Sequence, residues 1–444
     1  MDRPSVHSVT LNRELCKGCI NCIKRCPTEA IRVRDGKAAI ISERCVDCGE
    51  CIRICPHHAK RAVSDPLEVL DRYAYKIALP PPSLYVQFNN LDEQDVVLEG
   101  LLRLGFDSVF EVARAAELIS EATRRLMQSR DLPRPVISSA CPAVTRLICV
   151  RFPQLMDHIL PLISPMELAA RMAKDEAIRK TGLPPTEIGC IFITPCPAKV
   201  SAIHAPIGSG ESAVDAAVAV KDIYPPLLSA MKKAAPVEYL AGAGRIGLGW
   251  GESGGEAAAL MSTERYLAAD GIENVIRVLS DLEDEKYPDL DFVELNACAG
   301  GCVGGVLQVE NPYIAKAKMK HLRRTMPVSL NHITDELAEL VRWDRDVRYN
   351  PVMELGETRA ERFERYARME EITAMLPGLD CGSCGAPTCA SLAEDVVRGN
   401  ADINDCTVLM RRRMEAVLRA LGTVSYTHLL SHQFLLLTPV LYYQ

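Results

Sequence analysis

The chain has 444 residues, of which 48% are hydrophobic, and its 51 basic and 58 acidic side chains give a formal net charge of −7. This length allows two to four domains with separate cores, and the acidic balance argues against nucleic acid as a partner. The N-terminal stretch MDRPSVHSVTLNREL lacks the apolar core of a signal peptide, and no run of 18 apolar residues precedes residue 423. We therefore expect a cytoplasmic protein with no membrane partner. The 18 cysteines then indicate reduced thiolate ligands, because disulfide frameworks belong to exported proteins.

Residues 1–75 contain the spacing C-x2-C-x2-C-x3-C-P twice. In such a run three thiolates surround one cubane from a tight loop, and the fourth cysteine, before Pro27 or Pro56, ligates the other cluster. Zinc is the alternative, although zinc sites do not need two interleaved four-cysteine runs. We predict a small α+β domain of bacterial ferredoxin type, with two [4Fe-4S] clusters and a hairpin about Asp35-Gly36. The predicted ligands are Cys16, Cys19, Cys22, Cys26, Cys45, Cys48, Cys51 and Cys55.

Residues 76–345 alternate short apolar runs with amphipathic helices such as PMELAARMAKDEAIRK, which is the pattern of an α/β domain with mostly parallel sheets flanked by helices. Three of these runs, PVIS, GCIFI and FVEL, lead directly into loops that contain cysteine. We expect the three strands to bring the loops together at one edge of a buried sheet. Four soft ligands at strand ends indicate an iron–sulfur centre. These ligands are Cys141, Cys196, Cys298 and Cys302.

The stretch AGAGRIGLGWGESGGE contains a G-x-G-x-x-G pattern at residues 242–247. A dinucleotide site needs the third glycine in the first turn of a helix, but we expect the next helix, EAAALMSTERYLAA, to begin only after Gly255. We interpret the stretch as a glycine-rich loop near the cluster pocket and keep a nucleotide site as the alternative. Cys149 and Cys190 lie in apolar runs without ligand spacing, which predicts core positions for both.

Residues 346–422 begin with a linker and a charged helix, TRAERFERYARMEEITAML, and continue to a third cysteine group. This C-x2-C-x4-C run with a distant fourth cysteine suits either [4Fe-4S] or zinc. It resembles the small helical [4Fe-4S] domain of the Rnf-B component of Rnf-type electron-transport complexes, which implies an iron–sulfur cluster. The ligands would be Cys381, Cys384, Cys389 and Cys406.

The last stretch, residues 423–444, is apolar without helical periodicity and is interrupted by histidine and proline. It resembles translated adaptor sequence, and we expect it to be a non-native tail. Several hydrogenase-like proteins with this domain order continue into a PAS sensor domain, and we expect the natural chain to continue as well.

The three cysteine loops of residues 76–345 resemble the motifs of the [FeFe]-hydrogenase large-subunit family, and the stretch LRLGFDSVFEVARAAELISEAT extends this resemblance. In that family the motifs hold the H-cluster, a [4Fe-4S] cubane joined through the last cysteine to a di-iron unit with CO, cyanide and a bridging dithiolate. The match gives Cys302 the bridging position and Lys199 the position of the lysine that holds a cyanide. The resemblance covers roughly residues 8–420 and implies reversible H2 oxidation, with H2 and protons as substrates and a ferredoxin-like redox partner.

Three positions depart from the catalytic members of this family. A proton-relaying cysteine usually precedes the first cluster cysteine, where this chain has Ala140, and two methionines are replaced by Thr194 and Asn296. A lost relay implies slow turnover, and the resemblance is therefore to the sensory class, with H2 sensing and a signalling partner. Two alternatives stay open: an electron-transfer or scaffold iron–sulfur protein without the di-iron unit, and a ferredoxin-linked catalytic hydrogenase subunit.

Overall fold

The computed structural model describes residues 7–128, 132–234, 239–261, 265–286 and 288–420, so the expected non-native tail lies outside the described residues. The chain divides into two compact units, Met1–Met353 and Glu354–Gln444. This boundary falls inside the linker that the sequence predicts after residue 345. No helix in the described ranges has both the length and the apolar character that a membrane span requires.

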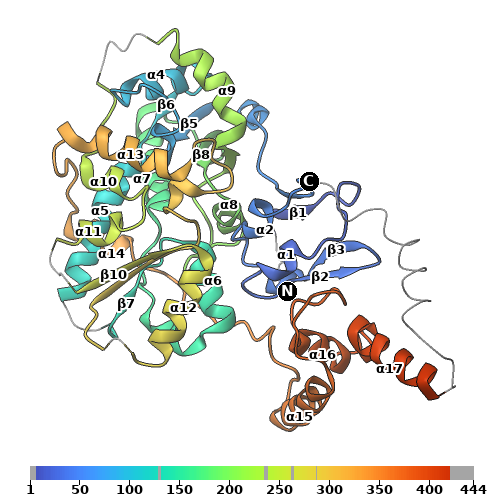
Figure 1. The fold of residues 1–444 in the computed structure, drawn as a ribbon. Helices are drawn as coiled ribbons and strands as arrows, with labels where there is room; N and C mark the ends of the chain where they lie inside the picture. The colour runs from blue at the N-terminus through green and yellow to red at the C-terminus, as the bar shows by residue number, and fades with distance from the viewer. Residues whose placement is uncertain (1–6, 129–131, 235–238, 262–264, 287, 421–444) are drawn as a thin grey trace. The chain divides into compact units, whose positions relative to one another are not determined.

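The N-terminal segment, residues 7–75, is built from two antiparallel strand pairs and two short helices (Figure 1). Its hairpin turns through Asp35 and Gly36, whose φ angles of 53° and 69° are those of a type I′ turn. The predicted hairpin is therefore confirmed. The elements are β1 (Val9–Leu11), α1 (Asn21–Lys24), β2 (Ile31–Arg34), β3 (Lys37–Ile40), α2 (Glu50–Arg53) and β4 (Lys60–Ala62).

A four-stranded parallel sheet follows, with the order β6-β5-β8-β9. Its strands are buried on both faces, because Cys190 and Phe192 face one hydrophobic core while Ile191 and Ile193 face another. Helices α5 and α7 belong to the first core, and α4 and α9 to the second. The bounds are β5 (Tyr75–Leu79), α4 (Asp95–Arg103), β6 (Ser108–Val109), α5 (Val112–Gln128), α7 (Pro165–Thr181), β8 (Ile188–Thr194), β9 (Ala216–Ala219) and α9 (Val220–Met231).

A second parallel sheet has the order β10-β11-β7 and packs against helices α6 and α12. The expectation of a single buried sheet was therefore wrong, since β8 lies in the other sheet. The three apolar runs do form strands, but an apolar run does not encode which neighbour a strand pairs with. The bounds are β7 (Val136–Ile137), α6 (Pro142–Arg151), β10 (Tyr266–Asp270), α12 (Ile272–Glu283) and β11 (Phe292–Asn296).

The expected helix EAAALMSTERYLAA was also wrong. Only Gly255–Ala259 is helical, as α11, and the residues from Tyr266 form strand β10 beside β11. Short apolar runs are ambiguous between helix and strand, and pairing with a buried strand decides this one. The remaining helices of this unit are α3 (Pro82–Tyr85), α8 (Pro197–His204), α10 (Arg245–Gly249), α13 (Pro312–Leu322) and α14 (Asp335–Leu340).

The second unit is helical, as its sequence predicts, and has a small core of its own. Helix α15 packs along α16, and buried Ile372, Leu376 and Leu392 close the contact. Its helices are α15 (Arg359–Met375), α16 (Cys389–Val397) and α17 (Thr407–Ala420).

Candidate metal centre

The loops after β7, β8 and β11 bring the four predicted cysteines of the α/β segment to one place. Cys141 and Cys196 are the N-cap residues of α6 and α8, and a proline follows each of them in the first helical turn. Proline suits that position because the amide it lacks has no partner within the helix. Both thiols thus lie at helix N-termini, where the helix dipole favours a thiolate. Cys298 and Cys302 follow β11, and Cys302 begins a short 3-10 turn.

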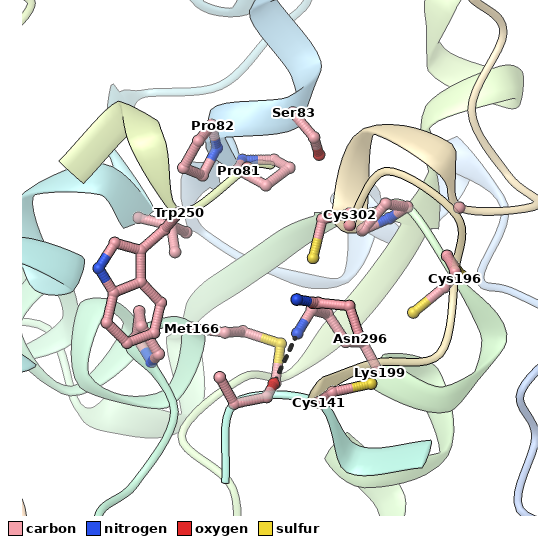
Figure 2. Close-up of a pocket in the computed structure, with 18 of the residues that line it drawn as sticks. Pro81, Pro82, Ser83, Cys141, Met166, Cys196, Lys199, Trp250, Asn296 and Cys302 are labelled. Atoms are coloured by element: carbon pink, nitrogen blue, oxygen red, sulfur yellow. Dashed lines mark hydrogen bonds between the residues drawn. The ribbon is translucent and has the colours of Figure 1, made fainter. Parts of the chain in front are cut away.

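All four cysteines line a single cavity of about 80 Å³, which we call the cluster cavity. Figure 2 shows the sulfurs of Cys141, Cys196 and Cys302 directed into the space that Lys199 and Asn296 also enter. Ala140 lines the cavity as well, and its carbonyl accepts a hydrogen bond from Lys199 Nζ at 3.3 Å. A single water needs only about 10–15 Å³ by this kind of measure, so the space suits a larger group. The rest of the lining is mainly apolar and includes Pro81, Pro82, Met166, Phe192, Pro195 and Trp250.

Burial makes the thiols of this cavity weak acids in the metal-free protein. It raises the pKa of Cys196 to about 12, and it also raises the pKa values of Cys298 and Cys302. Burial alone would lower the pKa of Lys199, but the surrounding thiolates outweigh it and raise that pKa. The amino group is therefore a fixed positive charge among thiols that ionise once metal binds, and metal loading should release protons.

Two of the departures from the catalytic members have identifiable contacts. The Thr194 hydroxyl donates to the Cys196 carbonyl at 2.9 Å, so this buried side chain shapes the second cysteine loop. Asn296 lines the cluster cavity, and its Nδ2 donates to Glu294 Oε1 at 2.8 Å.

Glu256 and Glu294 are buried carboxyl groups of the same cavity, and the sequence interpretation missed both. Glu294 accepts hydrogen bonds from the Gly254 and Ala257 amides and from Asn296, three donors that favour its ionised form. Burial, and then the charge of Glu294, raise the pKa of Glu256. Glu256 is therefore the member of the pair that holds a proton.

The Glu256 carboxyl has one oxygen engaged and one free among the described residues. Ser138 Oγ donates to Oε2 at 2.5 Å, whereas Oε1 is buried without a hydrogen-bond partner. An acidic proton on Oε1 would thus be available to a group in the cavity. The only sequence signal was the glutamate after Gly254-Gly255, and its pairing with a carboxylate 38 residues away depends on the fold.

These residues fit the group that the resemblance implies. Four thiols in one cavity are the donor set of a [4Fe-4S] cubane. Ser83 Oγ lines the cavity, is fully buried and has no hydrogen-bond partner within the described chain, as if placed for a polar ligand. Sequence reasoning also missed Ser83, which follows the proline run PPP.

The eight N-terminal cysteines form two neighbouring groups. The thiol of Cys22 interacts with those of Cys16, Cys19 and Cys55, whereas the thiols of Cys45, Cys48 and Cys51 interact with that of Cys26. The fourth cysteine of each run thus lies with the other run, which is the exchange that the spacing predicts.

The third cysteine group lies within the second unit. Cys384 interacts with Cys381 and Cys406, and Cys389 packs into the same small core. Cys381 is exposed and Cys406 is buried, so the group is open to solvent on one side. Outside the groups, Cys190 is fully buried in β8, as predicted, and Cys149 is half-buried in α6.

The glycine-rich loop has no free amides for a nucleotide phosphate at two of its glycines. A helix, α10, does begin after Gly244, contrary to our expectation. However, the amides of Gly242 and Gly244 donate to the carboxylates of Glu111 and Glu117, each at 2.6 Å. Carboxylates in the place of a phosphate argue against the nucleotide alternative.

Comparison with known proteins assigns a family to each of the three regions. Residues 76–239 and 252–306 match the family described as "Iron only hydrogenase large subunit, C-terminal domain". Residues 8–56 match the 4Fe-4S dicluster domain family, and residues 376–408 match the FeS family of Fe-S cluster segments.

Curated relatives agree with these matches. The periplasmic [Fe] hydrogenase large subunit of Nitratidesulfovibrio vulgaris is 30% identical over 217 residues, which are 45% of this chain and 52% of that protein. Iron hydrogenase 1 of Clostridium pasteurianum is 23% identical over 286 residues, 53% of this chain and 49% of the relative. The chain thus spans about half the length of these two relatives. The Rnf-B-type component of the ion-translocating oxidoreductase complex of Rhodobacter capsulatus is 51% identical over 39 residues, 9% of this chain and 21% of that component.

Among solved structures, a variant of [FeFe]-hydrogenase HydA1 from Chlamydomonas reinhardtii aligns with a TM-score of 0.46 and 17% identity, covering 57% of this chain and 87% of that one. The family matches and the curated relatives carry the assignment. The chain belongs to the [FeFe]-hydrogenase large-subunit family, with a 4Fe-4S dicluster region before the hydrogenase domain and an Rnf-B-like Fe-S region after it.

Proposed function

We propose that this protein binds an H-cluster and carries out reversible H2 oxidation slowly, as an H2 sensor. The observation that carries the proposal is the cluster cavity, where four thiols from three distant loops surround Lys199. A ferredoxin-like redox partner or a signalling partner would exchange electrons or information with it. We propose the regions 1–75, 76–345 and 346–422 as its three working parts.

The residues of the cavity would divide the work among them. When bound, the di-iron unit would supply the H2-splitting chemistry. Lys199 would neutralise negative ligands with its fixed charge, and Ser83 Oγ would donate a hydrogen bond to one of them. Glu256 would hold an exchangeable proton at Oε1. The cubane ligands would be Cys141, Cys196, Cys298 and Cys302, with Cys302 shared by the di-iron unit.

The sensory part of the proposal depends on Ala140. Its methyl group lines the cavity at the position where catalytic relatives carry a proton-relaying thiol, and a methyl group can neither accept nor donate a proton. Slow turnover would let a bound state persist long enough to be read by a partner.

Infrared spectroscopy of protein matured without oxygen tests the proposal. We expect CO and cyanide stretching bands that respond to H2, and we expect Cys302→Ser to abolish them while the N-terminal cluster signals remain. If the wild type shows no such bands after maturation, the scaffold alternative is correct. If the bands survive in Cys302→Ser, the assignment of the third loop is wrong.

A further inference from the structure

Arg53 connects the N-terminal segment to the third cysteine loop. It ends helix α2, between the predicted ligands Cys51 and Cys55. Its guanidinium donates from Nη2 to the Gly304 carbonyl at 2.7 Å, two residues after Cys302. Glu50 Oε2 lies 3.4 Å from Nε and helps to hold the side chain in this direction. The contact joins residues 251 positions apart.

The same N-terminal loop also contacts the elements that follow the other two cysteine loops. The buried Asp47 carboxylate accepts from Ser201 Oγ on α8 at 2.8 Å and lies 3.5 Å from Arg146 Nη1 on α6. Gly49 lies so close to Val306 that a Cβ there would be 2.8 Å from the valine side chain. Cys48 packs on the hydrophobic core that also includes Cys141 and Cys196. Residues 47–53 are therefore fixed against all three loops of the cluster cavity.

The charge of Arg53 acts on this centre. Burial raises the pKa of the Cys298 thiol, and the Arg53 cation opposes that rise by stabilising the thiolate. Reduction of a cubane adds one negative charge to it, and the potentials of such clusters depend on nearby charges and hydrogen bonds. A nearby cation therefore favours the reduced form.

We propose that Arg53 is a positioning residue with an electrostatic role: it holds the Cys48 cluster group beside the cubane of Cys298 and raises the reduction potential of that cubane. The proposal rests on the proposed function, because it needs a cubane at Cys298.

Arg25 is a matched control in the same segment. Its guanidinium also reaches across to the α/β segment, where Nη1 pairs with Glu273 on α12. Both side chains of this pair are about half exposed, and Glu273 lies outside the cluster cavity. Removing Arg25 thus breaks an ion pair across the same contact without removing a charge beside the cubane.

The test is a redox titration, followed by electron paramagnetic resonance, of the full chain reconstituted with iron and sulfide but without the di-iron unit. Cys298→Ser identifies the signal of the cavity cubane. We expect Arg53→Gln to move its midpoint potential to a more negative value and to weaken its spin coupling to a second cluster. Arg53→Lys should keep most of the potential, because it keeps the charge, and Arg25→Gln should leave both readouts unchanged.

The outcomes separate the two proposals. If no signal depends on Cys298, the proposed function fails and the role of Arg53 fails with it. If the signal is present but Arg53→Gln leaves its potential unchanged, or Arg25→Gln shifts it equally, only the role of Arg53 is overturned. Iron analysis of each variant, together with Arg53→Lys, distinguishes a lost charge from a lost cluster.

Discussion

A short hydrogen-bonded chain links Ala140 to the buried acid of the cluster cavity. The Ala140 amide donates to Ser138 Oγ at 3.2 Å, and this hydroxyl donates to Glu256 Oε2 at 2.5 Å. The residue that lacks a thiol is thus two hydrogen bonds from a carboxyl that holds a proton. Residue by residue, the chain has lost one proton carrier that its relatives use and has another group that can carry a proton.

We expect Ala140→Cys to raise turnover. A general acid or base contributes roughly 10²- to 10⁴-fold, about 3–5 kcal/mol of barrier, and part of this should return with the thiol. The measurement is H2 oxidation with a viologen dye at equal di-iron occupancy. A fast wild type, or an Ala140→Asp variant unchanged in rate while Ala140→Cys falls, would contradict the relay explanation.

Glu256→Gln should change how stability depends on pH. The folded protein keeps the Glu256 proton above the ordinary carboxyl pKa of 4.5, whereas the unfolded chain releases it. The stability from this group is therefore complete below that pKa and is lost as pH rises through the raised pKa. Melting temperatures of metal-free protein between about pH 5 and pH 8 should fall more steeply for the wild type than for Glu256→Gln.

The exposed Glu68 provides the control for that measurement, because Glu68→Gln should reproduce the wild-type slope. Parallel slopes for wild type and Glu256→Gln would show that Glu256 does not hold its proton in the folded protein.

At the scale of elements, the third cysteine loop depends on close backbone contact. Gly301 has φ of +89°, and a Cβ there would lie 2.5 Å from the Ser253 amide nitrogen. This contact presses the loop between β11 and α13 onto the segment that precedes α11 and Glu256. The loop therefore brings Cys302 and the buried acid to the same cavity by backbone packing.

We expect Gly301→Ala to displace this loop, lowering both the melting temperature and the yield of the Cys298-dependent cluster signal. A residue forced into a sparsely populated backbone region costs about 1–3 kcal/mol, and the clash adds to this. Gly182 is the control, since its φ is +70° but a Cβ there meets nothing within 4 Å. Equal loss of the cluster signal in Gly182→Ala and Gly301→Ala would rule out the contact as the cause.

At the scale of the whole molecule, sixteen of the 18 cysteines fall into four groups of four. If each group holds a cubane and the cavity also holds a di-iron unit, fully matured protein should contain about 18 irons per chain. Metal analysis checks this number. About ten or fewer irons with stoichiometric zinc would instead mean that some groups are zinc sites.

The sequence by itself determined the cysteine groups, the hairpin at Asp35-Gly36 and the strands before the three loops, because ligand spacing, turn chemistry and apolar runs are local features. The tertiary structure alone decided that β8 belongs to a different sheet from β7 and β11, and that YLAAD forms a strand. It also decided the pairing of Glu256 with Glu294 and the contact of Arg53 with Gly304. These features depend on packing between distant segments, which changes a buried carboxyl's pKa or a cation's neighbours without leaving a periodic pattern in the chain.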